Sequence, residues 1–357
     1  MKKLVLTLCV VLVAAGLFAR GAATADAAAG TPTPTPTPAP AASPSATPPR
    51  IDDPNDIIRI ETELVNIDVR VVDRNNRPVN GLKQSDFKVF EDGKEQQIDF
   101  FTQSEVPTNY GLVVDNSGSM RQQLDKVIEA GKVLISTNKP EDESLVIRFV
   151  GKDKIEIVQN FTSNKQDLMD ALDNLYIEGG QTAIRDAVYL AVENIDEYEK
   201  SKKADDHKRR ALILVSDGED RASYYNDKQL MDLLRESEVQ IYVIGFLDDL
   251  SKDGGFISKS PREKAKAFLD SLAQETGGKA YYPASVNDLP ALAREISNEL
   301  RTQYSIGYIP SNDRKDGTYR SIKVQVTDGP GGSHRVPITR AGRTAEGGSA
   351  ATAPKKN

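Results

Sequence analysis

The sequence predicts an α/β protein with a doubly wound, mostly parallel sheet and a smaller all-β, sandwich-like module. In the middle of the chain, continuous apolar runs alternate with amphipathic segments of helical period, which is typical of strand–helix repeats. Near both ends, apolar residues recur at every second position, as in half-buried strands. We therefore interpret residues 107–301 as an α/β domain, inserted in or flanked by β segments at 57–106 and 302–340 that pack together.

The N-terminus has the residue order of a secretory signal. Two lysines precede an apolar run from Leu4 to Phe18, and small residues follow. We expect residues 1–27 to be a signal peptide cleaved after Ala25 or Ala27, and the protein to be secreted to a periplasm, a cell envelope or the medium. A retained membrane anchor is the alternative, although the run is shorter than the roughly 20 residues that span a bilayer. No membrane span is expected after cleavage.

Two further segments have compositions typical of chain without a packed core. Proline alternates with Thr, Ala and Ser from Thr31 to Pro49, so residues 28–56 are predicted to be an extended linker. Residues 341–357 are rich in Gly, Ala, Ser and Thr and are predicted to be a disordered tail.

The residue inventory excludes several functions. The net charge of −7 and the absence of a basic stripe argue against nucleic-acid binding. The one cysteine, Cys9, lies in the apolar leader without the small residues that lipoprotein processing prefers, so no disulfide is expected in the mature chain. The two histidines, His207 and His334, lie in polar, loop-like sequence. Cysteine or histidine metal sites and histidine-based catalysis are therefore not expected.

The β segments are predicted from alternation and turn residues. Residues 65–71 alternate Val or Ile with polar residues, and Asp92-Gly93 predicts a hairpin between strands at 87–90 and 97–100. Late in the chain, alternation at 304–308 and 322–326 lies on either side of an Asp-Gly turn.

The α/β domain is predicted element by element from the same patterns. Continuous apolar runs predict buried strands at 110–114, 211–215 and 240–244, and further strands are predicted at 145–149 and 155–161. Amphipathic runs predict helices at 124–135, 183–195, 264–273 and 289–300, with a short strand at 279–282.

Polar side chains follow two of these buried strands. Asp115, Ser117 and Ser119 follow the first, Asp217 follows a later one, and Thr182 precedes a helix. In open α/β sheets, ligands bind at the carboxyl ends of the strands, which favours a site built from these residues. Four of these residues also have a simpler interpretation, the three hydroxyl residues as helix caps and Asp217 as a turn residue before glycine.

Taken together, Asp115-x-Ser117-x-Ser119, the later Thr182 and the Ser-Asp217-Gly sequence resemble the von Willebrand factor type A family. They match its metal-ion-dependent adhesion site at all five positions. The resemblance covers about residues 109–301 and implies a Rossmann-like fold, and the β segments further resemble secreted bacterial proteins called VWFA-related. It implies that the three hydroxyls bind a divalent ion, with both aspartates bound directly or through water. Such oxygen ligands suit Mg²⁺, with Mn²⁺ as a substitute.

The resemblance implies an adhesion or binding protein rather than an enzyme. Its partner would be a protein that supplies an Asp or Glu carboxylate to the ion. Two other functions stay open: an envelope component in which the metal is purely structural, and a Mg²⁺-dependent phosphohydrolase with Asp115 as nucleophile. Against the phosphohydrolase, Ser117 stands where a second acid is expected, and no Gly-rich phosphate loop is present. Asp186, Glu219 and Asp220 are interpreted as solvated or structural residues, with a supporting or rim position at the metal site as the alternative.

Overall fold

The computed structural model describes residues 64–345, apart from 104, 203–207, 249 and 254–258. These residues all lie in one compact unit of the chain, Ile60–Asn357. The predicted signal peptide and linker, and the last part of the predicted tail, lie outside the described residues and stay predictions. None of the helices in the described ranges combines the length and the apolar character needed to cross a bilayer.

A mixed, mostly parallel sheet forms the centre of the α/β domain. Within the described residues it has six strands, in the order β10-β9-β8-β5-β6-β7. Neighbouring strands are parallel except β7, which runs antiparallel to β6. Every residue of β5 is buried, as its continuous apolar sequence predicts for a strand covered on both faces. The strands are β5 (Thr108–Asp115), β6 (Glu143–Phe149), β7 (Ile155–Thr162), β8 (Arg209–Ser216), β9 (Gln240–Gly245) and β10 (Lys279–Tyr281).

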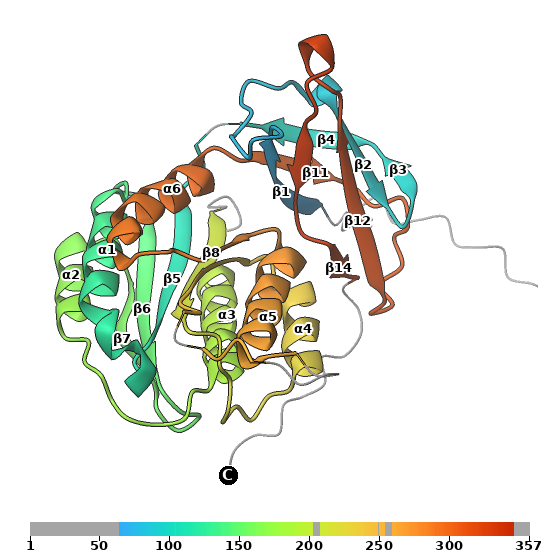
Figure 1. Cartoon of the computed structure of the whole chain (residues 1–357). Coiled ribbons are helices and arrows are strands. Elements are labelled where there is room, and N and C mark those ends of the chain that lie inside the picture. Colours follow the sequence, from blue (N-terminus) through green and yellow to red (C-terminus); the bar gives the residue numbers. More distant parts are fainter. Residues whose placement is uncertain (1–63, 104, 203–207, 249, 254–258, 346–357) are drawn as a thin grey trace, which may run out of the picture. The chain divides into compact units, whose positions relative to one another are not determined.

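Helices cover both faces of this sheet (Figure 1). One face packs against α1, α2 and α6, and the other against α3, α4 and α5. Side chains of β5 alternate between the two cores, with Leu112 and Val114 in one and Val113 in the other. The helices are α1 (Leu124–Ser136), α2 (Lys165–Asp173), α3 (Ile184–Lys200), α4 (Asp227–Glu236), α5 (Pro261–Thr276) and α6 (Leu289–Arg301). The predicted fold class is confirmed.

Two helices, α2 and α4, were not predicted from the sequence. Each is short, nine residues in α2 and ten in α4, which is less than the window of about 11–18 residues over which helical periodicity is judged. In α4 the buried side chains are Leu230 and Leu234, and in α2 they are Leu168, Ala171 and Leu172. Both helices are stabilised by packing against a neighbouring helix, which the local sequence does not reveal.

The β segments before β5 and after α6 form one sandwich. In the described part of the chain, its two antiparallel sheets have the orders β13-β1-β11-β4 and β14-β12-β2-β3. Because β1 pairs with β11 and β2 with β12, each sheet contains strands from both sides of the inserted α/β domain. Their apolar faces share a core that includes Val69, Val89 and Tyr304. The strands are β1 (Val65–Val72), β2 (Phe87–Glu91), β3 (Lys94–Gln96), β4 (Ile98–Thr102), β11 (Tyr304–Tyr308), β12 (Tyr319–Val326), β13 (Val336–Ile338) and β14 (Gly342–Thr344).

The predicted hairpin exists, but its second strand was predicted wrongly. Asp92 and Gly93 have φ values of 48° and 78°, as a two-residue hairpin turn requires. So short a turn pairs Glu91 with Lys94, which makes β3 the partner of β2. Residues 98–100 of the predicted second strand instead belong to β4, which crosses to the other sheet and pairs with β11.

The ordered chain also extends further than the sequence predicts. Residues 342–344 form β14, which pairs with Tyr319–Ser321 of β12, although a disordered tail was predicted from Ala341. The Arg343 guanidinium donates to the buried Glu91 carboxylate at 3.1 Å. Backbone pairing with β12 and the ion pair between Arg343 and Glu91 fix β14 to the sandwich, although its composition is typical of a loop.

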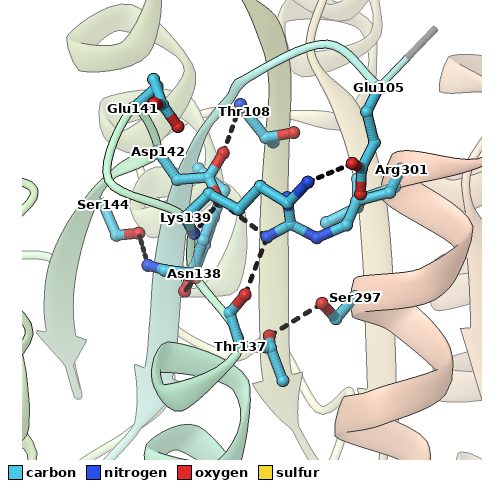
Figure 2. A network of polar contacts seen from close by, with 12 residues as sticks. Glu105, Thr108, Thr137, Asn138, Lys139, Glu141, Asp142, Ser144, Ser297 and Arg301 are labelled. Carbon is cyan, nitrogen blue, oxygen red and sulfur yellow. Dashed lines mark hydrogen bonds and ion pairs between the residues drawn. The ribbon is translucent and has the colours of Figure 1, made fainter.

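A polar network joins the points where the chain enters and leaves the α/β domain (Figure 2). The buried Asp142 carboxylate accepts hydrogen bonds from the backbone N–H groups of Thr108 at 2.9 Å and Lys139 at 2.7 Å. It also pairs with the Arg301 guanidinium at 2.6 Å, and Arg301 donates to the Thr137 carbonyl at 3.0 Å. The first residue of β5 and the last residue of α6 are thereby fixed to the connection between α1 and β6.

Candidate metal-binding site

The candidate site lies where the winding direction of the sheet reverses. β5 and β8 are adjacent parallel strands, with Val114 opposite Val215, so both end at the same edge. The helix after β5, α1, packs on one face of the sheet, and the helix after β8, α4, packs on the other. Such a reversal opens a crevice at the carboxyl ends of the strands, which is the usual ligand position in open α/β sheets.

Asp115 lies at the carboxyl end of β5, beside this reversal. Its side chain is completely buried at the last position of β5. One carboxylate oxygen accepts the backbone N–H of Ser117 at 2.9 Å, and the other accepts the Ser216 hydroxyl at 2.7 Å. Burial raises the pKa of Asp115 to about 6, with the neighbouring negative charge of Asp217 as a further cause. Asp115 therefore occupies a position where a cation would stabilise its charged form.

Ser117 and Ser119 present their hydroxyls to each other. The two Oγ atoms lie 2.9 Å apart, with Ser117 buried and Ser119 exposed. Ser117 precedes a short 3-10 helix, Gly118–Gln122, but its side chain makes no capping hydrogen bond. Gln123 is the N-cap residue of α1. The alternative interpretation of these serines as helix caps is therefore not supported.

Thr182 lies in the loop before α3. Its backbone carbonyl accepts the N–H groups of Arg221 at 2.9 Å and Ala222 at 3.1 Å, which joins this loop to the one after β8. The N-cap residue of α3 is Ala183, so Thr182 is not the cap either. Among the residues that the structure describes, the nearly buried Thr182 hydroxyl has no hydrogen-bond partner. It is available to an external ligand.

The Asp217 carboxylate makes one hydrogen bond within its own loop and carries a negative charge next to Asp115. One of its carboxylate oxygens accepts the Glu219 N–H at 3.0 Å, as the turn interpretation of this residue predicts. The side chain is only 5% exposed and acts electrostatically on Asp115. Two such carboxylates in one crevice repel each other, and a divalent cation between them would offset that repulsion.

Other polar residues hold the three loops in place, and sequence reasoning assigned them only in part. Asp186, at the start of α3, accepts the backbone N–H groups of Tyr224 at 2.8 Å and Tyr225 at 2.9 Å. Asp220 accepts the Arg185 N–H at 2.8 Å, so both aspartates have the structural role favoured above.

The sequence analysis did not identify two further residues that make hydrogen bonds around the site, although both are adjacent to candidate residues. Ser216 donates to Asp115, and the Asn116 amide donates to the Tyr176 carbonyl at 2.7 Å.

The chemistry of the donor set fits a hard cation. Hydroxyl and carboxylate oxygens are the ligands that Mg²⁺ and Mn²⁺ accept. Across the described ranges, no cluster of three or more His, Cys, Asp or Glu side chains is arranged to hold a metal. A metal site here would thus depend on the hydroxyls as well as on the two aspartates.

A comparison with protein-family models matches residues 111–295 to the von Willebrand factor type A domain. The match covers just over half of the 357 residues. The chain belongs to the von Willebrand factor type A family. All the candidate metal ligands, from Asp115 to Asp217, lie within the matched residues.

Relatives of this von Willebrand factor type A chain are similar to it over part of its length. Inter-alpha-trypsin inhibitor heavy chain H4 of Bos taurus is 25% identical over 232 residues, which cover 62% of this chain and 24% of that protein. The chain therefore spans about a quarter of the length of that relative. A solved von Willebrand factor type A structure from Catenulispora acidiphila has a TM-score of 0.44 and 12% identity, covering 79% of this chain and 75% of the other. Proximal thread matrix protein 1 of the mussel byssus, solved with a zinc-occupied adhesion-site motif, has a TM-score of 0.43 and 18% identity, covering 55% and 48%.

Proposed function

We propose that this protein is a secreted or envelope-associated binding protein that captures a protein partner through a divalent cation. The observation that carries the proposal is that three loops meet at the carboxyl edge of the sheet, each with side-chain oxygens that we propose as ligands. These ligands are Asp115, Ser117, Ser119, Thr182 and Asp217. Secretion is supported by the lysines, the apolar run and the small residues of the predicted leader.

The proposed cation is Mg²⁺, with Mn²⁺ as a substitute. The hydroxyls of Ser117, Ser119 and Thr182 would bind it, and Asp115 and Asp217 would hold it directly or through water. Because hydroxyl ligands are neutral, the ion keeps positive charge to attract a further anion. A partner's Asp or Glu carboxylate is the proposed occupant of that open position, which gives binding without a reaction.

The residues that follow Asp115 support a binding function over the phosphohydrolase alternative. Ser117 stands two residues after Asp115, where an aspartyl phosphohydrolase is expected to carry its second acid. A purely structural metal remains the second candidate, because the same ligands also join three loops.

Metal binding is tested by calorimetric titration of Mg²⁺ and Mn²⁺ into the chelator-treated chain from Ala28 onward. The titration is repeated with acetate, which offers a carboxylate for the open position. We expect saturable binding that Ser119→Ala or Thr182→Val weakens about tenfold or more. Ser136→Ala removes an exposed hydroxyl near the end of α1 and should leave binding unchanged. No binding to the folded protein at millimolar ion, with and without acetate, would contradict the proposal.

Adding a chelator distinguishes a cation that mediates capture of the partner from a cation that only joins the loops. If the cation mediates capture, a chelator should release the partner while the circular dichroism spectrum stays that of the folded protein. If the cation only holds the loops, the chelator should change the circular dichroism spectrum, and capture should be lost only together with the fold.

A further inference from the structure

A cavity of about 430 Å³ lies at the opposite, amino-terminal edge of the parallel sheet. One wall is the outer face of the sandwich sheet, with Asp68 of β1, Ser305 of β11 and Phe100 of β4. The other wall contains Arg210 and Gln240, at the amino ends of β8 and β9. Small-molecule sites have volumes of roughly 300–1,000 Å³ and favour module boundaries, so both size and position suit a ligand.

The described residues that line the cavity carry more positive than negative charge. The cationic ones are Lys208, Arg209, Arg210 and Arg340, and the acidic ones are Asp68 and Glu238. Three of these cations have carboxylate partners: Lys208 pairs with Glu143 at 2.8 Å, Arg209 with Asp68 at 3.1 Å, and Arg210 with Asp196 at 3.3 Å. Their charges are largely offset within the protein.

Arg340 differs from the other three cations. Its guanidinium donates to the carbonyls of Gly342 and Arg235, each at 2.7 Å, and both acceptors are neutral. Within the described part of the chain, no carboxylate lies within ion-pair distance of 4.0 Å. Burial lowers the pKa of Arg340, with the more distant negative charge of Glu238 acting in the opposite direction. A half-buried cation held by neutral acceptors gains free energy when an anion reaches it.

The cavity also offers an apolar surface. Phe100 lies on the outer face of its sheet, opposite Gly307, and is 48% exposed. Leu234 and Val239 line the same cavity from the α/β domain. A ligand that carries both a carboxylate and an apolar body would satisfy Arg340 and cover Phe100 together.

We propose that this cavity binds a small organic carboxylate, whose carboxylate group pairs with Arg340 and whose apolar body packs against Phe100. The site is separate from the proposed metal site, because it uses the amino ends of β8 and β9 and none of the oxygen ligands at the carboxyl edge. It therefore does not depend on a cation.

The test uses 4-fluorobenzoate and its neutral isostere 4-fluorobenzamide as probes, observed by fluorine NMR line broadening with the chain from Ala28 onward. We expect saturable binding of the benzoate, at least about tenfold weaker binding of the benzamide, and an about tenfold loss of benzoate affinity in Arg340→Gln. Arg335→Gln, which changes an arginine outside the cavity, should bind as the unaltered protein does. With a chelator present, benzoate binding should be the same in Thr182→Val, and any additional binding that Mg²⁺ brings should be lost in Thr182→Val.

Arg340 also donates hydrogen bonds to two backbone carbonyls, so its replacement could disturb the fold. A second variant is therefore tested. Phe100→Ser alters an exposed side chain, should keep the fold, and should weaken benzoate binding several-fold through lost apolar contact. The proposal is overturned if the benzoate does not bind, if both probes bind equally, or if folded Arg340→Gln and Phe100→Ser bind like the unaltered protein. Binding lost in Thr182→Val would assign the benzoate to the metal site instead.

Discussion

Replacing Asp142 by alanine tests how the inserted α/β domain is fixed at its two ends. The carboxylate is only 1% exposed and accepts hydrogen bonds from Thr108, Lys139 and Arg301 at 2.9, 2.7 and 2.6 Å. The Arg301 side chain is 13% exposed, so the variant leaves a largely buried guanidinium without its carboxylate (Figure 2).

The expected loss follows from these contacts. A hydrogen bond to a charged group contributes about 1.5–3 kcal/mol, but three such bonds on one carboxylate do not add independently. Removing one partner of a buried ion pair costs about 3–5 kcal/mol. We therefore expect Asp142→Ala to lower the free energy of unfolding by about 3–5 kcal/mol. Asp142→Asn keeps one acceptor oxygen and the shape, and should lose about half as much.

The assay is urea unfolding followed by far-ultraviolet circular dichroism, in which a pure stability change moves the midpoint and leaves the slope unaltered. Glu129→Ala is the matched control, because Glu129 forms an exposed ion pair with Lys126 at 2.7 Å. Such a pair contributes about 1 kcal/mol or less. If Asp142→Ala loses less than about 1 kcal/mol, or no more than Glu129→Ala, the network does not hold the domain ends as argued.

Three further predictions concern the packing of the fold. Gly277 and Gly331 both have positive φ, but a Cβ on Gly277 would lie 2.5 Å from backbone atoms of Thr339 and Arg340, whereas one on Gly331 meets nothing within 4 Å. Gly331→Ala should lower the free energy of unfolding by about 1–2 kcal/mol, and Gly277→Ala should lower it clearly more. If thermal unfolding shows equal losses for the two variants, the close approach of Gly277 to the backbone of Thr339 and Arg340 is wrong. The Phe101 ring packs on the rings of Phe87 and Tyr304, at centroid distances of 5.3 and 5.8 Å, while the Phe100 side chain is exposed. Phe101→Ala should therefore lower the free energy of unfolding by about 3 kcal/mol, and Phe100→Ala by less than about 1 kcal/mol. Similar losses at 100 and 101 would mean that β4 does not cross to the second sheet. Asp186→Ala should lower stability by about 2–4 kcal/mol and weaken Mg²⁺ binding, because it frees the loop after β8, whereas the exposed Asp167→Ala should leave the calorimetric titration unchanged.

Much of the candidate site could be predicted from the sequence, because the relevant signals are local. A continuous apolar run followed at once by Asp115 and two serines identifies a buried strand and the polar residues at its carboxyl end. The same reasoning applies to Asp217 after β8. Since carboxyl ends of parallel strands meet at one edge, residue type and order were sufficient to predict a common site, although not the bonds that Ser216 and Asn116 make around it.

Strand pairing in the sandwich was decided only in the tertiary structure. The local sequence predicts strands near 87–90 and 97–100, but a two-residue turn gives the first strand a different partner and sends the second to the other sheet. The pairing of β14 with β12 likewise depends on backbone contacts between distant residues rather than on an apolar pattern. Periodicity along the chain determines which residues form an element and which face is buried. The contacts of an edge, a loop or a cavity wall come from residues far apart in sequence, so only the folded chain brings Arg340, Phe100 and the amino ends of β8 and β9 around one cavity.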